Sequence, residues 1–357
     1  HLQGQNTTAS PSELAAQVAL LVKDQMASFL ADQQCMVATD TATISGLTGD
    51  FKWDGGVLAP NGKIYGIPYH SASVLIIDPD TNTADVTTIS GLSGQFKWWG
   101  GVLAPNGKIY GIPHASASVL IIDPVTNTAD VTTITGLAGS DNKWIGGVLA
   151  NNNKIYGISY DSTSVLIIDP TTNTADTTSI TGLTGQIGKW FGGVLADNGK
   201  IYGIPYSSTS VLIIDPATNT ADTTTITGLS GQFKWHDGVL ARNGKIYGIP
   251  RDSTSVLIID PTTNTADITT MTGLPGHDKW MGGVLAGDDK IYGIPHGAAS
   301  LLVIDPATNT ADTSITGLGT ANYKWDRGVL AGNGKIYGIP RSAASVLVIQ
   351  CVVTKGL

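Results

Sequence analysis

The chain has 357 residues, of which 41% are apolar and only 13% are charged, and its formal net charge is −8. An acidic chain lacks the basic face that a nucleic-acid backbone or an anionic membrane surface needs, so both are excluded as partners. The apolar content is enough for a large core, which excludes disorder. No uncharged apolar run reaches the roughly 18 residues of a membrane span.

The first 34 residues differ in kind from the rest of the chain. The sequence starts at His1 with no apolar run behind a basic start. This is expected for a secreted chain whose signal peptide has been removed, and also for a chain trimmed at its start. Asn6-Thr7-Thr8 is an N-glycosylation sequon, which indicates the same extracellular compartment. We expect residues 1–34 to form an N-terminal arm and helix, separate from a domain over residues 35–357.

An amphipathic helix is predicted over residues 10 to 34. Ser10-Pro11-Ser12-Glu13 is a capping box with proline at the first helical position. The apolar residues that follow fall on one broad helical face, namely Leu14, Val18, Leu21, Val22, Met26, Phe29 and Leu30. Such a face must be buried either on the rest of the chain or on another subunit, and both alternatives stay open.

A repeat of 45 or 46 residues fills positions 50 to 350. Its marker is the dipeptide Lys-Trp, whose tryptophans are Trp53, Trp98, Trp144, Trp190, Trp235, Trp280 and Trp325. In the first unit, apolar runs at 55–59 and 63–67 flank the hairpin turn Asn61-Gly62. A third run at 73–77 is followed by an Asp-Pro turn and the β-branched run 84–89. We call these strands a to d. Four short antiparallel strands per unit predict an all-β protein, a seven-bladed β-propeller.

The two ends of the repeat region indicate how the ring closes. The last unit stops after strand c at 346–349, and the segment 40–47 matches a strand d, so we expect an N-terminal strand to complete the seventh blade. Aligned with the repeat, Cys351 falls on the proline of the Asp-Pro turn and Cys35 on the residue after it. This predicts a Cys35–Cys351 disulfide in place of the missing turn, and hence an oxidising compartment. The alternative is two free buried thiols.

Two loop positions vary between units, whereas the Lys-Trp pairs, the strand b tyrosines and the Asp-Pro turns recur as scaffold residues do. The position after strand b holds Tyr69, His114, Tyr160, Tyr206, Arg251, His296 and Arg341. The position after the tryptophan holds Asp54, Trp99, Ile145, Phe191, His236, Met281 and Asp326. Because the b–c and d–a loops of a propeller open on one face, we expect these positions to ring one surface. Planar side chains there suit sugar rings or a protein partner. Alternatively, they pack against the next blade's loop.

No catalytic or metal site is evident in the sequence. The histidines beyond His1 are scattered over different units, and the pair His236-Asp237 with Asp54 or Asp326 is a coincidence of loops. An aspartate before proline, such as Asp78, is what a turn requires rather than a calcium ligand. Two cysteines and scattered histidines give no zinc-binding spacing. We therefore expect a protein that is not an enzyme and binds no metal or cofactor.

The repeat resembles known propeller repeats. The run 211–220, which reads Val-Leu-Ile-Ile-Asp-Pro-Ala-Thr-Asn-Thr, resembles the YVTN-type repeats of cell-surface proteins, and the Gly-Gly of strand a resembles kelch repeats. The longer unit Lys-Trp-x-Gly-Gly-Val-Leu-Ala-Pro-Asn-Gly-Lys-Ile-Tyr-Gly-Ile-Pro is similar to repeats in uncharacterised secreted proteins of algae and other protists. These resemblances imply a propeller in a surface or extracellular setting.

Two functions are weighed ahead of the others. The first is a structural subunit of an extracellular oligomer or fibre, which self-associates or binds another extracellular protein through residues 1–34. The alternative is a lectin-like propeller that binds carbohydrate or protein on the face formed by the b–c and d–a loops. An enzyme that uses this same face is the least supported, because no nucleophile with a base and no paired carboxylates in one pocket are evident.

Overall fold

The computed structural model describes residues 35–137, 139 and 142–353. Every regular element in this part of the chain is a β-strand. The helix expected over residues 10 to 34 and the sequon at Asn6 lie outside the described residues. A compact unit comprises Asp40–Ile349, and the described ends 35–39 and 350–353 belong to a second unit.

The strands fall into four groups by their position in the blade. The a strands are β2 (Trp53–Leu58), β6 (Trp98–Leu103), β10 (Trp144–Leu149), β14 (Trp190–Leu195), β18 (Trp235–Leu240), β22 (Trp280–Leu285) and β26 (Trp325–Leu330). The b strands are β3 (Ile64–Pro68), β7 (Ile109–Pro113), β11 (Ile155–Ser159), β15 (Ile201–Pro205), β19 (Ile246–Pro250), β23 (Ile291–Pro295) and β27 (Ile336–Pro340). The c strands are β4 (Leu75–Asp78), β8 (Leu120–Asp123), β12 (Leu166–Asp169), β16 (Leu212–Asp215), β20 (Leu257–Asp260), β24 (Leu302–Asp305) and β28 (Leu347–Val353). The d strands are β5 (Thr83–Asp85), β9 (Thr128–Asp130), β13 (Thr174–Asp176), β17 (Thr220–Asp222), β21 (Thr265–Asp267), β25 (Thr310–Asp312) and β1 (Cys35–Asp40).

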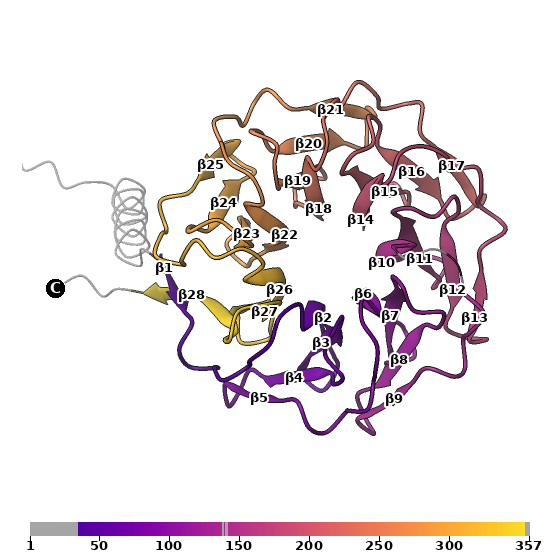
Figure 1. Ribbon diagram of the computed structural model, residues 1–357. Coiled ribbons are helices and arrows are strands. Elements are labelled where there is room, and N and C mark those ends of the chain that lie inside the picture. The colour runs from indigo at the N-terminus through magenta and orange to yellow at the C-terminus, as the bar shows by residue number, and fades with distance from the viewer. Residues whose placement is uncertain (1–34, 138, 140–141, 354–357) are drawn as a thin grey trace, which may run out of the picture. The chain divides into compact units, whose positions relative to one another are not determined.

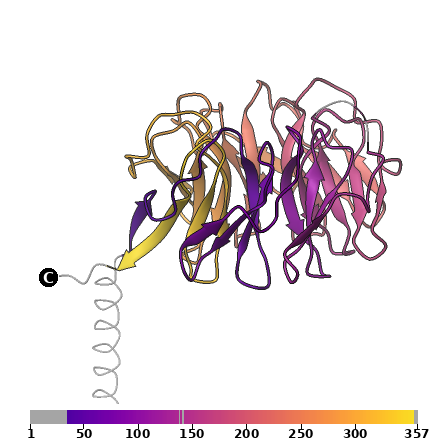
Figure 2. The ribbon, with the colours of Figure 1, turned by 60° about the horizontal axis from the view of Figure 1, so that its bottom comes forward.

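Seven four-stranded antiparallel sheets are arranged around one axis, as the repeat predicts (Figure 1). In six blades the strands follow the sequence, as in β2-β3-β4-β5, and the seventh has the order β26-β27-β28-β1. The a strands of successive blades contact one another around the axis. We call the face formed by the b–c and d–a loops the loop face, and the opposite face, formed by the short hairpins, the hairpin face. In Figure 2 the loop face is at the top.

The N-terminal segment closes the ring as expected, but its strand is Cys35–Asp40 and not the expected segment 40–47. After β1, the backbone at Ser45 pairs with that of Ser345. The N–H of Leu47 donates to the carbonyl of Ala344, and the N–H of Val346 donates to that of Ile44, both at 2.9 Å. Ile44 and Leu47 are buried in one cluster with side chains of the first and seventh blades. The first strand in sequence therefore supplies the last strand of the seventh blade.

Strand d is shorter than the β-branched run predicts. The expected strand 84–89 is only Thr83–Asp85 in the structure. The carboxylate of Asp85 accepts hydrogen bonds from the backbone N–H groups of Thr87 and Thr88, at 2.6 and 3.2 Å, and from both hydroxyl groups. These side-chain contacts form a turn that competes with the sheet ladder. The aspartate therefore ends the strand.

The Lys-Trp pair joins neighbouring blades at the loop face. Lys97 is buried, and its ammonium donates to three backbone carbonyls, those of Tyr69, Ser71 and Gly94, at 3.0, 2.9 and 2.8 Å. Two of these carbonyls belong to the preceding blade. The indole N–H of Trp98 donates to the carbonyl of Ser118 within its own blade, at 2.7 Å. In all seven units the lysine donates to the carbonyl of the residue after strand b of the preceding blade, and the indole N–H makes the same bond, so the pair is a scaffold element.

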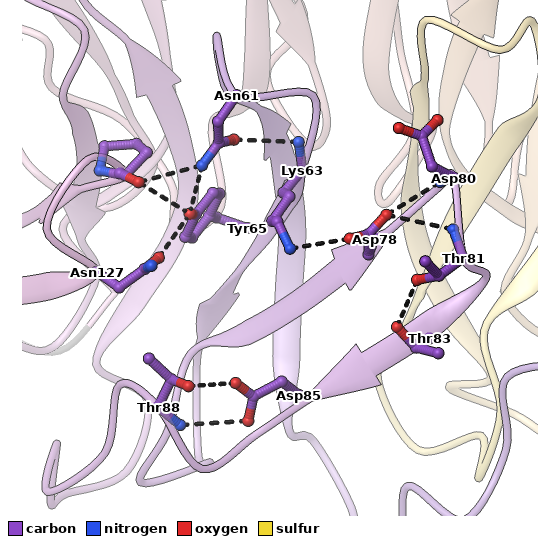
Figure 3. Close-up of polar contacts among 11 residues, drawn as sticks. Asn61, Lys63, Tyr65, Asp78, Asp80, Thr81, Thr83, Asp85, Thr88 and Asn127 are labelled. Carbon is purple, nitrogen blue, oxygen red and sulfur yellow. Dashed lines mark hydrogen bonds and ion pairs between the residues drawn. The ribbon is translucent and has the colours of Figure 1, made fainter.

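A second junction joins neighbouring blades at the hairpin face (Figure 3). The hydroxyl of Tyr65 donates to Asn127 of the next blade at 2.8 Å, and the amide of Asn61 donates to that hydroxyl and to the carbonyl of Pro124. Asp78 has a turn-forming role, because its carboxylate accepts the N–H groups of Asp80 and Thr81 and pairs with Lys63. The recurrent tyrosine and aspartate thus hold the scaffold together.

Candidate functional site

The variable loop positions meet at the loop-face end of the axis. Tyr69, Trp99, Ile145, Phe191 and Tyr206 form one buried cluster, against which Phe51 and Tyr160 pack. We call this the central cluster. Its rings touch edge to face, with centroids 4.9 Å apart for Tyr69 and Trp99 and 5.2 Å for Trp99 and Phe191. Such contacts stabilise beyond simple burial of area. The central cluster therefore closes the axis with apolar groups from the first four blades.

A buried arginine and two buried carboxyl groups lie beside the central cluster, and we call the cluster and these groups together the central layer. The guanidinium of Arg341 lies 4.9 Å from the Trp99 ring and 5.5 Å from the Tyr69 ring. It is 3.6 Å from the carboxyl of Asp54 and 3.7 Å from that of Asp326, both fully buried. Burial raises the pKa of Asp54 well above its usual value, Asp326 raises it further, and Arg341 opposes the shift. Arg341 thus faces two buried carboxyl groups at once, and burial disfavours the ionisation of Asp54.

The buried histidines of this layer are neutral. Burial lowers the pKa of His114 and of His296 to about 3, and it lowers that of His236 well below the ordinary value. The ring of His236 lies against that of Phe191, with 3.4 Å between the ring centroids and 37° between the ring planes. Side chains that stay neutral and enclosed in this way contribute to packing. The layer holds acid and base groups, but buried aromatic rings surround them.

The next residue along strand a forms a ring of glycines around the axis, and this ring contains one ion pair. The third residue of strand a is glycine in five blades, with φ near +70°, but Asp237 in the fifth and Arg327 in the seventh. The Nε of Arg327 donates to the Asp237 carboxylate at 2.7 Å. A Cβ built on Gly100 would lie 2.7 Å from the guanidinium, so only glycine leaves space for this side chain. We call Arg327 and Asp237 the axial pair.

Partly exposed aromatic rings lie above the central cluster in four of the seven units, at the residue two places before the tryptophan. Phe96, Phe233 and Tyr323 are 43%, 42% and 36% exposed, and Phe51 is half-buried. All four have left-handed backbone, with φ between 51° and 61°. The equivalent residues of the other three units, Asn142, Gly188 and Asp278, also have left-handed backbone, so the conformation belongs to the repeat and the aromatic ring is what these four units add to it.

Three of these rings and one histidine form a continuous chain across the loop face. Ring centroids are 5.0 Å apart between Tyr323 and Phe51, 5.5 Å between Phe51 and His70, and 4.4 Å between His70 and Phe96. We call these four residues the aromatic arc. The arc crosses the junctions of the seventh, first and second blades. The fourth exposed ring, Phe233, lies in the fifth blade beneath the Arg251 guanidinium, at 5.3 Å.

A groove runs beside the aromatic arc. Its volume is about 390 Å³, and His70 is common to both features. Polar groups come from Thr48, Asp50 and Ser71, while Leu47, Trp53 and Val86 supply apolar surface. Small-molecule sites have about this volume and combine apolar walls with a few polar groups. The groove and the arc together therefore form a candidate ligand-binding surface.

The structure brings the predicted binding residues together, but it does not expose most of them. Tyr160 and Arg251 are half-buried. The other candidates are buried, namely Tyr69, Trp99, His114, Phe191, Tyr206, His236, His296 and Arg341. They pack against one another and against the side chains of neighbouring blades, as the ring contacts of Tyr69, Trp99 and Phe191 show. The expected open ring of these side chains is therefore a closed layer, and the accessible rings are those of the preceding loop residue.

Sequence reasoning missed the aromatic arc and the axial pair. The signal for the arc was the residue before Lys-Trp, which is aromatic in four units and lies in the d–a loop, outside the expected strands. The signal for the axial pair was the loss of the first glycine of Gly-Gly in two units, at Asp237 and Arg327. The axial pair is a departure from the repeat, whereas the aromatic residue before Lys-Trp is shared by four of the seven units.

Within residues 35–353, no helix is long and apolar enough to cross a membrane. No group of three or more histidine, cysteine or acidic side chains among the described residues is arranged to hold a metal ion. The assembly helix and the glycosylation site of the sequence prediction lie outside this part of the chain.

The fold is shared with proteins of diverse roles. No protein-family model matches the sequence, and neither does any curated protein. Virginiamycin B lyase from Staphylococcus aureus is 9% identical with a TM-score of 0.71, and the match covers 89% of this chain and 100% of the lyase. Hydrazine synthase from Kuenenia stuttgartiensis is 14% identical with a TM-score of 0.66, covering 86% and 97%. The extracellular domain of a putative one component system from B. thetaiotaomicron is 9% identical with a TM-score of 0.65, covering 89% of this chain and 43% of that one. At these identities the likeness shows the seven-bladed fold alone.

Proposed function

We propose that the protein is a non-enzymatic, carbohydrate-binding propeller, and that its ligand lies on the aromatic arc and in the adjoining groove. One observation carries the proposal, namely that the large rings of Phe51, Phe96 and Tyr323 lie partly exposed in one continuous row on the loop face. A purely structural aromatic residue gains stability by burial, whereas an exposed ring offers a flat apolar surface on which a sugar ring stacks.

The surroundings of the arc support a carbohydrate over a protein partner. The groove presents the carboxylate of Asp50 and the hydroxyls of Thr48 and Ser71 beside apolar surface, a combination that matches the hydroxyl groups and C–H faces of sugars. Its volume of about 390 Å³ suits a small saccharide. A stable protein complex typically needs about 800 Å² of contact on each partner.

The burial of the Asp54 and Asp326 carboxyl groups supports a binding role over a catalytic one. Asp54 and Asp326 are 0% exposed beneath the central cluster. A general acid must come within hydrogen-bond distance of the substrate. A saccharide on the aromatic arc contacts aromatic rings and loop hydroxyls instead.

The test is a glycan array followed by calorimetry with the strongest glycan. Phe51→Ala and Phe96→Ala should each weaken binding by about tenfold, which corresponds to about 1.4 kcal/mol. Phe233→Ala is the matched control, because it removes an equally exposed, left-handed ring outside the arc, and its affinity should equal that of the wild type. Failure to retain any glycan, or an equal loss in all three variants, would contradict the proposal.

We further propose that the protein is extracellular and that its ring is locked by a Cys35–Cys351 disulfide. Two observations support the cross-link: the cysteines lie in the neighbouring strands β1 and β28, and Cys351 has no free thiol. The extracellular domain of similar fold agrees with that compartment, as does the expected sequon at Asn6. Alkylation without reductant, followed by mass spectrometry, should leave both cysteines unmodified; two alkylated thiols would refute the disulfide.

A further inference from the structure

The axial pair lines a second cavity that the aromatic arc does not use. This cavity has a volume of about 140 Å³ and is lined by paired glycines of the first four blades, such as Gly100-Gly101 and Gly146-Gly147, with Asp237 and Arg327. A single water needs only about 10–15 Å³ of such space. The cavity is therefore large enough for an organic molecule of several non-hydrogen atoms.

Arg327 has hydrogen-bonding capacity to spare. Its Nε is bound to Asp237, and among the described residues no acceptor is hydrogen-bonded to its terminal nitrogens, Nη1 and Nη2. These nitrogens lie beside the cavity, where a Cβ built on Gly100 would be 2.7 Å from Nη1 and one on Gly146 would be 3.1 Å from Nη2. The side chain is 13% exposed. Two parallel N–H groups of a guanidinium match the two oxygens of a carboxylate.

Asp237 supplies the opposite charge at the same cavity. One carboxylate oxygen accepts the Nε of Arg327 at 2.7 Å, and the other accepts the backbone N–H of Gly238 at 2.9 Å. The side chain is 19% exposed, and each oxygen keeps acceptor capacity for a further donor. A ligand with only a negative charge would meet this carboxylate unfavourably. A ligand that also has an ammonium group would pair with it.

We propose that the axial cavity binds a small zwitterion of the amino-acid class, with its carboxylate on the terminal nitrogens of Arg327 and its ammonium group at Asp237. The glycine ring provides the space, because any side chain at those positions would fill it. The axial pair is net neutral, so a zwitterion adds no uncompensated charge to this enclosed site.

The repeat itself supplies a matched variant for the test. Arg327→Gly combined with Asp237→Gly restores the glycine that the other five blades have at this position, so the variant should fold. Its folding is checked by circular dichroism and thermal melting. Phe96→Ala, which alters the aromatic arc and leaves the cavity intact, is the control for non-specific effects.

The probes are glycine, acetate and methylammonium, with L-phenylalanine as a probe of size, measured by calorimetry and by ligand-observed NMR in a buffer free of amino acids. Glycine should bind wild type and Phe96→Ala equally, at least tenfold more tightly than acetate or methylammonium, and L-phenylalanine should not bind. The double variant should lose glycine binding by at least tenfold. Equal binding of acetate, binding of glycine by the double variant, or no binding of glycine to the wild type would each overturn the proposal.

Discussion

The lysine before each blade's first tryptophan is a buried cation whose partners are backbone carbonyls. Burial lowers the pKa of Lys97 to about 8, so the side chain remains protonated at neutral pH. Its carbonyl partners span two blades. The lysine therefore joins two blades through hydrogen bonds to backbone carbonyls, with no carboxylate as partner. This role explains its sevenfold recurrence in a chain with few charges.

Replacing this lysine should loosen a blade junction. Lys97→Met keeps the length of the side chain but leaves buried carbonyls without a donor, and we expect a loss of about 2 kcal/mol in the free energy of unfolding. Lys108→Met is the control, because Lys108 is 43% exposed and pairs with Asp123 only at 3.4 Å, so its loss should be below about 1 kcal/mol. Urea denaturation of both variants measures the difference.

The buried lysines also predict how stability depends on pH. Burial lowers the pKa to about 8 for Lys52, Lys97, Lys234, Lys279 and Lys324, against about 10.4 in an unfolded chain. Between these values the unfolded state binds more protons than the folded state, so stability rises with pH. Above about pH 10 the unfolded tyrosines ionise, whereas burial raises the pKa of Tyr206, and stability falls again.

We therefore expect the urea midpoint to rise from pH 8 to pH 10. The rise should be smaller in Lys97→Met, which has one such lysine fewer. A midpoint that declines steadily from pH 8 would show that the carbonyl contacts hold the ammonium protons more strongly than burial opposes them.

Among the elements, the hairpin-face junction between neighbouring blades has one exception. It lies between the sixth and seventh blades, where the chain closes the ring. In the sixth blade, Asp288 replaces the hairpin asparagine, and the hydroxyl of Tyr292 donates to it at 2.8 Å. The next blade has no Asp-Pro turn, because β28 takes its place and continues to Val353. The sequence thus changes where the partner carbonyl is missing.

This exception provides an internal control for the junction. Tyr110→Phe should cost about 1 kcal/mol, because it removes the hydrogen bond to Asn173 of the next blade, at 2.9 Å. Tyr292→Phe should cost less, since it loses only an exposed acceptor within its own blade. Thermal melting of the two variants compares them directly, and an equal loss would mean that the junction adds nothing across blades.

Most of the elements could be predicted from sequence, and the failures have physical causes. The period of the repeat and its hairpin turns were enough to predict four strands per unit. The early end of strand d depends on the side chain of Asp85 and not on β-propensity. The burial of Tyr69 and Trp99 depends on how closely seven blades approach the axis, which no single unit encodes. The same convergence moves accessible aromatic surface to Phe51 and Phe96.

For the whole molecule, assembly through residues 1–34 remains a prediction. If the amphipathic helix joins subunits, the full chain should form oligomers or fibres, and a chain starting at Gln34, which keeps Cys35 and β1, should be monomeric. Light scattering and negative-stain microscopy of both chains measure this. If both chains are monomeric, the helix does not join subunits. If the short chain associates as strongly as the full chain, the contact lies on the ring.

The glycine ring also determines how many copies of the repeat the chain can use. A Cβ built on Gly55 would lie 3.5 Å from the Cα of Gly100, and the corresponding distances from Gly100 to Gly146 and from Gly146 to Gly192 are 3.4 and 3.3 Å. A Cβ on one of these glycines would thus touch the backbone of the next inner strand. An eighth unit would widen the axis and separate Arg327 from Asp237, so duplication of one unit would break the axial pair.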